Sequence, residues 1–193
     1  MSYPLPLKSV ALIGRQDSPE AADSIAALAD FFHARGVSVL VETETAIQTE
    51  QLLGKAALAA GDCADFQQIG SQVDLAVVVG GDGTMLHAAR QLARYDRPLV
   101  GINQGRLGFM TDIARSDMLE AMTLLLDGKF MQEERLLLDT KVVFGGASAT
   151  WQPQANLAFN DVVIDKGAIG RMIEFELRVD AGGARQFHEL GAG

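Results

Sequence analysis

The sequence predicts an α/β domain built on a parallel sheet, followed by an all-β, antiparallel domain. Two observations carry this prediction. Up to Gly128, short continuous apolar runs alternate with segments whose apolar residues recur at helical spacing, as in strands buried on both faces and joined by helices. Beyond Gly128, apolar and polar residues alternate one by one, which is typical of half-buried strands. We therefore expect an α/β domain over residues 1–128 and the beginning of a β domain over residues 129–193.

The first half of the α/β domain opens with an apolar run at residues 10–13, bounded by a glycine, which predicts a buried strand. A helix-start signal at residues 17–20 precedes an amphipathic segment that Gly36 closes. Residues 37–41 predict a second strand, and residues 50–60 a second helix.

The second half continues the alternation. Residues 74–79 form the clearest strand, and residues 84–95 place apolar side chains on one helical face. Residues 98–102 predict a fourth strand, and residues 117–126 a helix that Gly128 ends. A parallel sheet of this kind carries helices on both faces and binds ligands beyond the carboxyl ends of its strands.

The predicted β domain is short. Residues 136–144 alternate apolar and polar side chains before a glycine pair, and residues 173–180 alternate again. Because the chain ends at Gly193, soon after this strand, we expect the β domain to be incomplete, with an open sheet edge that favours self-association.

Composition excludes several classes of function. Of the 193 residues, 48% are hydrophobic, so a sizeable core can form. With 16 basic against 25 acidic residues, the net charge of −9 argues against a broad surface for nucleic acid or for anionic membranes. No apolar run approaches the ~18 residues of a membrane span. The single cysteine, Cys63, permits no internal disulfide, which favours the cytoplasm.

The strongest local signal is the glycine loop between the strand at 74–79 and the following helix. Its residues are Gly80, Gly81, Asp82, Gly83 and Thr84. Glycines let a backbone approach a ligand, and successive amides at a helix amino end bind phosphate. A carboxylate beside a phosphate suits a base that takes a proton from an attacking hydroxyl. The alternative is that Asp82 caps a helix beginning near Thr84.

Two further segments carry polar or flat side chains suited to a nucleoside. Residues 101–112 contain three glycines and Asn103 in a tight turn, and Phe109 offers either a flat face for a base or a core contact. Asn160 and Asp161 precede an apolar run; they can recognise a base edge and a ribose diol, or they can form an ordinary turn.

In order and spacing, these three segments and the later Arg171 resemble bacterial NAD kinases over residues 9–180. The resemblance implies an α/β domain joined to a β domain, transfer of phosphate from ATP to the 2′-hydroxyl of the adenosine ribose of NAD, and a homo-oligomer. It implies that Asp82 accepts the proton. Magnesium would arrive with ATP, and no metal-ligating residues are expected. The expected nucleotide-binding residues are Gly80, Gly81, Gly83, Thr84, Phe109, Asn160, Asp161 and Arg171.

Two other interpretations stay open. The glycine loop is shared with diacylglycerol kinases, so the chain can also be interpreted as a lipid kinase. In the family that the chain resembles, a TPTGSTAY-like segment completes the dinucleotide site, and it would come after residue 193. The chain could therefore be a non-catalytic nucleotide-binding fragment.

Overall fold

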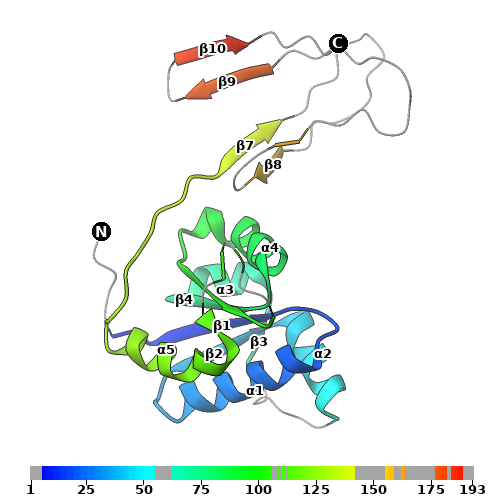
Figure 1. Ribbon diagram of the computed structural model, residues 1–193, viewed down its shortest axis with the longest axis vertical. Helices are drawn as coiled ribbons and strands as arrows, with labels where there is room; N and C mark the ends of the chain where they lie inside the picture. Colours follow the sequence, from blue (N-terminus) through cyan, green and yellow to red (C-terminus); the bar gives the residue numbers. More distant parts are fainter. Residues whose placement is uncertain are drawn as a thin grey trace. The chain divides into compact units, whose positions relative to one another are not determined.

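The computed structural model describes most of the α/β part and short stretches of the remainder (Figure 1). The described residues are 6–54, 62–105, 108, 110–111, 113–141, 155–158, 162–163, 177–181 and 184–188. The chain divides into two compact units, Met1–Asn160 and Asp161–Gly193, and each is described by itself. The predicted domain boundary at residue 128 stays a prediction.

A six-stranded parallel sheet forms the framework of the first unit. The strands stand in the order β3-β2-β1-β4-β5-β6. Their bounds are β1 Ser9–Gly14, β2 Ser38–Glu42, β3 Cys63–Ala64, β4 Leu75–Val79, β5 Leu99–Asn103 and β6 Ile113–Ala114. The chain moves outward from β1 to β3, and then continues on the other side of β1 with β4. The carboxyl ends of β1 and β4 therefore flank the switch point at which open α/β sheets bind ligands.

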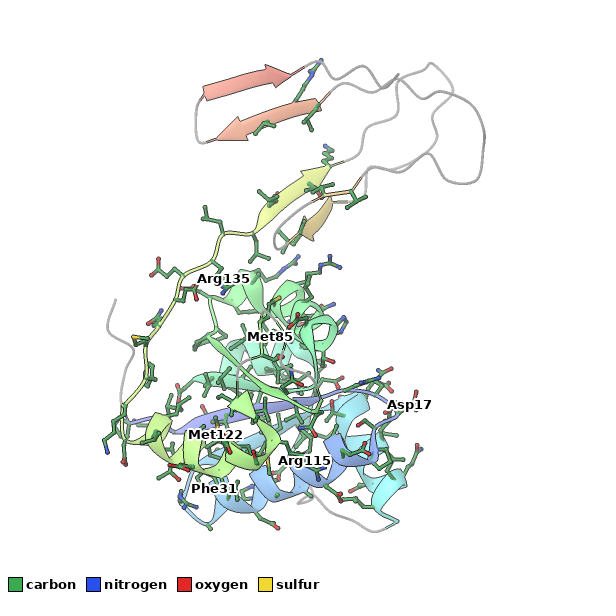
Figure 2. The ribbon with its side chains drawn as sticks, in the orientation of Figure 1. Asp17, Phe31, Met85, Arg115, Met122 and Arg135 are labelled. Atoms are coloured by element: carbon green, nitrogen blue, oxygen red, sulfur yellow. The ribbon has the colours of Figure 1, made fainter. Side chains whose placement is uncertain are left out.

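Helices cover both faces of this sheet, as predicted. They are α1 Pro19–His33, α2 Thr43–Leu53, α3 Phe66–Gln72, α4 Asp82–Leu92 and α5 Met118–Leu126, with short 3₁₀ turns at Ala93–Tyr95 and Arg115–Asp117. Figure 1 shows α1 and α5 on one side of the strands, and α3 and α4 on the other. Phe31 on α1 and Met122 on α5 lie on the first side, and Met85 on α4 lies on the second (Figure 2).

The side chains of the central strands explain this layering, because they alternate between two hydrophobic clusters. In β1, Val10 and Leu12 join the cluster of α1 and α5, whereas Ala11 and Ile13 join that of α3 and α4. All five residues of β4 are buried. A strand buried on both faces must be apolar at every position, which is why these strands were visible in the sequence.

Helix α1 begins and ends as the sequence predicts. The hydroxyl of Ser18 accepts a hydrogen bond from the Ala21 N–H at 3.3 Å, and Pro19 occupies the first helical position. At the other end, Gly36 has a φ of +71°, a conformation that side chains disfavour.

Three predictions for the α/β part were wrong. Helix α2 spans Thr43–Leu53, so it starts before the predicted residue 50, because the Glu42 carboxylate caps its start; Gly54, in the left-handed conformation, ends it, and residues 55–60 of the prediction lie outside the described residues. Helix α4 begins at Asp82, two residues before the predicted start at Thr84. The short β3 and α3 were not predicted, so the strand expected to be third is the fourth.

The described strands beyond Gly128 form two antiparallel pairs, which confirms antiparallel β structure there. The predicted strands at 136–144 and 173–180 lie outside the described residues at 142–144 and 173–176. Strand β7 (Leu138–Lys141) pairs with β8 (Ala155–Ala158) in the first unit. Strand β9 (Leu177–Ala181) pairs with β10 (Ala184–His188) in the second. Within the described part of the chain, no helix has both the length and the hydropathy needed to cross a membrane.

Candidate functional site

The glycine loop joins β4 directly to α4, at the carboxyl edge of the sheet. The Gly80 N–H donates to the Ile102 carbonyl at 2.9 Å, so pairing with β5 continues one residue past the end of β4. Gly81 is the N-cap residue of α4, and the helix has no side-chain cap. The amino end of α4 is therefore presented at the switch point without a capping side chain over it, which suits an anion.

The three glycines of the loop fall into two classes. A Cβ at Gly80 would lie 2.8 Å from the Cβ of Thr84, so packing within the loop requires a glycine there. Around Gly81 and Gly83 no described atom lies within 4 Å of an added Cβ. Gly81 also has a φ of −105°, which any residue adopts. Among the described residues, neither packing nor backbone strain requires this pair of glycines, which suits the close approach of a ligand.

Asp82 does not cap the helix, so the capping interpretation of this residue is wrong. It lies in the first turn of α4, and its half-buried carboxylate faces the segment that follows β5. There Oδ1 of Asp82 accepts a hydrogen bond from the Met110 N–H at 3.0 Å. Gly108 lies against the same carboxylate, since an added Cβ would be 2.7 Å from the Asp82 Cγ.

The segment that contacts Asp82 is fastened by Asn103, at the end of β5. This side chain is 4% exposed, and its Oδ1 accepts from the Gly105 N–H at 2.7 Å. Its Nδ2 donates to the Thr111 hydroxyl at 3.0 Å and to the Thr111 carbonyl at 3.4 Å. Asn103 therefore ties the beginning of this segment to its end.

The sequence predicts Asn103 only as part of a tight turn and Met110 only as a core-filling side chain, and it gives no role to Thr111. An asparagine at the end of a strand, followed by closely spaced glycines, was the available signal. The contact with Asp82 spans 28 positions and leaves no local pattern.

Two arginines, Arg15 and Arg115, directly follow β1 and β6 at the same edge of the sheet. The Arg15 N–H donates to the Val79 carbonyl at 2.8 Å, which places Arg15 directly beside the glycine loop. The pKa of Glu20 is lowered, chiefly because its own backbone N–H donates to the carboxylate, then because of the Ser18 hydroxyl, and to a smaller extent by Arg115 and Arg15. Arg115 also lies 3.5 Å from Asp23 (its position is labelled in Figure 2).

The structure thus brings Asp82, the glycine loop and the segment after β5 together. Four predicted residues, Phe109, Asn160, Asp161 and Arg171, lie outside the described residues, and their roles stay predictions. His87 lies on the exposed side of α4, where its ring meets that of Phe66 edge to face at 5.5 Å between centroids.

Comparison with known protein families distinguishes the two kinase families that share this glycine loop. The model of the ATP-NAD kinase N-terminal domain matches residues 10–130, which include every described residue of this site. The chain belongs to the ATP-NAD kinase family. This assignment favours the dinucleotide kinases over the lipid kinases that share the loop.

Curated relatives within the ATP-NAD kinase family cover most of the chain. A protein of Azoarcus sp. (strain BH72) named NAD kinase is 47% identical over 173 residues, which are 90% of this chain and 55% of the relative. A protein of Laribacter hongkongensis with the same name is 44% identical over 173 residues, 90% of this chain and 56% of the relative. The chain spans about half the length of the curated relatives it matches.

A solved structure has the same fold as this chain. Yeast NADH kinase, crystallised with NADH, superposes with a TM-score of 0.65 over 79% of this chain and 47% of its own, at 18% identity. At this level of identity, the likeness shows the fold alone.

Proposed function

We propose that this protein transfers the γ-phosphoryl group of ATP to the 2′-hydroxyl of the adenosine ribose of NAD, giving ADP and NADP. The proposal rests on one observation: a carboxylate fixed by a backbone hydrogen bond lies beside a glycine loop that leaves room for a ligand. Oδ1 of Asp82 is fixed by the Met110 N–H, and Gly81 and Gly83 beside it leave room for a ligand. This geometry does not specify which hydroxyl receives the phosphoryl group. We take NAD as that substrate from the relatives named NAD kinase.

In this reaction Asp82 is the proton acceptor. Its carboxylate takes the proton of the 2′-hydroxyl while the ribose oxygen forms a bond to the γ-phosphorus. The bond from that phosphorus to the β–γ bridging oxygen breaks, and ADP leaves. The backbone of Gly80–Thr84, at the amino end of α4, holds phosphate oxygens as charge moves across them.

Magnesium enters this scheme as part of the ATP substrate. The described residues contain no cluster of three or more potential metal-ligating side chains, and one carboxylate, Asp82, stands at the loop. An ion held mainly by the phosphates fits that donor set, and it would offset the negative charge between ATP and the carboxylate. The backbone of Arg15 lies beside the loop, and we propose that its guanidinium adds a positive charge there.

The remaining contacts with NAD are proposed from the family resemblance. Phe109 would line the dinucleotide pocket, Asn160 and Asp161 would contact the nucleoside, and Arg171 would add a further contact. We also propose that the protein self-associates through its β region and works in the cytoplasm. Exposed apolar side chains such as Leu138 (45%) and Val179 (43%) support self-association, which light scattering after size exclusion would measure.

The experiment that tests the function identifies the product. The protein is incubated with ATP, magnesium and NAD, and separately with diacylglycerol vesicles in place of NAD. Mass spectrometry should find the dinucleotide heavier by one phosphate, and an NADP-specific dehydrogenase should accept it. Absence of NADP, or phosphorylation of the lipid instead, would contradict the proposal.

A further inference from the structure

We propose that Asn103 and Thr111 are positioning residues for Asp82. This inference rests on the proposed function, in which Asp82 takes the proton. Asn103 and Thr111 do not touch the Asp82 carboxylate in any described contact. They act on it through Met110, whose backbone N–H donates to Oδ1.

Thr111 is held from two sides. Its hydroxyl accepts from Nδ2 of Asn103 at 3.0 Å, and its methyl group packs on the backbone of Gly101, where an added Cβ would be 2.7 Å from the Thr111 Cγ2. Thr111 is fully buried and Asn103 is 4% exposed. Polar side chains so deeply buried are expensive unless they are paired, and this pair satisfies itself.

The contacts of Asn103 and Gly101 clamp Thr111, and this clamp also limits where Met110 can lie. The planar peptide unit between Met110 and Thr111 carries the Met110 carbonyl, whose oxygen lies 3.0 Å from an added Cβ at Gly101. The Met110 N–H belongs to the preceding peptide unit, so with Thr111 and this carbonyl held it can move only by rotation about the bonds of the Met110 Cα. At the start of the segment, the Gly105 N–H donates to Oδ1 of Asn103 at 2.7 Å. One asparagine side chain thus holds both ends of the segment that reaches Asp82.

The clamp on Thr111 sets the orientation of the Asp82 carboxylate for the reaction. A proton acceptor must lie within hydrogen-bond reach of the hydroxyl, and small errors in its position cost large factors in rate. The Asp82 carboxylate can rotate about its side-chain bonds, and the Met110 N–H fixes one of its oxygens. A rigid donor at Met110 therefore holds the carboxylate in one orientation before substrate binds.

A pair of substitutions at residue 111 separates the hydroxyl from packing. Thr111→Val keeps the methyl group against Gly101 and loses the acceptor for Asn103, whereas Thr111→Ser keeps the acceptor. The matched control is Thr123→Val on α5, which removes a hydroxyl that donates to the Leu119 carbonyl, remote in the fold from the glycine loop. Each variant is made in the full chain.

The first readout needs no activity, since it is the exchange rate of the Met110 amide hydrogen measured by NMR. In Thr111→Val we expect this exchange to accelerate roughly tenfold, and the carboxyl carbon signal of Asp82 to shift. Thr123→Val should keep the rate of the parent protein, and Thr111→Ser, which loses only the methyl contact, should accelerate exchange less than Thr111→Val. Unchanged exchange in Thr111→Val would overturn the clamp, whether or not the protein forms NADP.

The second readout is the split between kcat and KM. Thr111→Val should lower kcat for NADP formation about ten- to a hundredfold with little change in the KM for ATP, and Thr111→Ser should recover most of kcat. If Thr111→Val loosens Met110 but leaves kcat unchanged, the positioning role is wrong. If the parent protein makes no NADP, the proposed function fails while the exchange data still decide the clamp.

Discussion

Oδ1 of Asp82 and the backbone N–H of Met110 are 3.0 Å apart, although 28 positions separate the two residues in the chain. This hydrogen bond joins the first turn of α4 to the segment after β5. It brings together two of the three sequence segments that suggested a dinucleotide kinase. The carboxylate proposed to take the proton is thereby held by a backbone group, whose position depends on the sheet.

Replacing Gly108 should separate the position of Asp82 from the stability of the fold. The Cβ of Gly108→Ala would overlap the Asp82 carboxylate, whereas Gly108 itself is exposed. We expect the free energy of unfolding to change by less than ~0.5 kcal/mol, and NADP formation to fall about a hundredfold. Gly105→Ala, whose added Cβ meets no described atom within 4 Å, is the matched control. Equal activity of the two variants would contradict the prediction.

The second prediction compares substitutions at Gly81, whose added Cβ meets no described atom within 4 Å, and at Gly80, which packs on Thr84. Gly81→Ala should fold normally but bind ATP at least about tenfold more weakly, because its methyl group would occupy ligand space. Gly80→Ala should instead destabilise the protein by about 1–3 kcal/mol, because its methyl group would press on Thr84. Calorimetric titration with ATP and urea unfolding measure the two effects. Unweakened ATP binding by Gly81→Ala would mean that no phosphate lies over that residue.

A third prediction concerns packing between α3 and the 3₁₀ turn at Ala93–Tyr95. An added Cβ at the buried Gly70 would overlap the ring of Tyr95, and the Gly70 carbonyl already accepts from Nε of Arg97 at 2.7 Å. Gly70→Ala should therefore lower the free energy of unfolding by about 1–3 kcal/mol. Adding Tyr95→Ala to Gly70→Ala should cost less than the two single changes summed. Additive effects would show that the ring is not the obstacle.

Acid should weaken the amino end of α1 through Glu20. Hydrogen bonds from its own N–H and from Ser18 lower the pKa of this carboxyl in the folded state from the usual 4.5. The contribution to stability is therefore present above that usual value and is lost as pH falls through the lower, folded pKa. In urea unfolding, the parent protein should exceed Glu20→Gln in stability at pH 7, by a small margin because Glu20 is exposed, and this margin should shrink as the pH falls below 4.5. A margin independent of pH would contradict this account.

The sequence predicts the sheet better than the site. Strands such as β4 are buried on both faces, so every residue is apolar and the run is conspicuous. Helix α2 buries two threonines and one alanine, Thr45, Thr49 and Ala46, which carry little apolar signal, so its start was misplaced. The two-residue β3 and the polar α3 fall below the length at which periodicity can be recognised.

At the site, sequence reasoning located the glycine loop and Asp82, because glycines and a carboxylate between a strand and a helix form a local pattern. It also allowed Asp82 to be a helix cap, since a capping residue and a residue of the first turn look alike in sequence. Only the fold shows Gly81 as the cap and Met110 as a partner of Asp82. The clamp of Asn103 on Thr111 is likewise a tertiary contact.

The most direct test of the central claim compares the parent protein with Asp82→Asn, which keeps the shape of the side chain and removes the proton acceptor. Single-turnover formation of NADP is measured at saturating ATP and NAD, together with the dissociation constants of both nucleotides. The account predicts a rate about 10²–10⁴-fold lower, with dissociation constants changed less than about threefold. A variant that forms NADP at a rate close to that of the parent protein would contradict the assignment of Asp82 as the base.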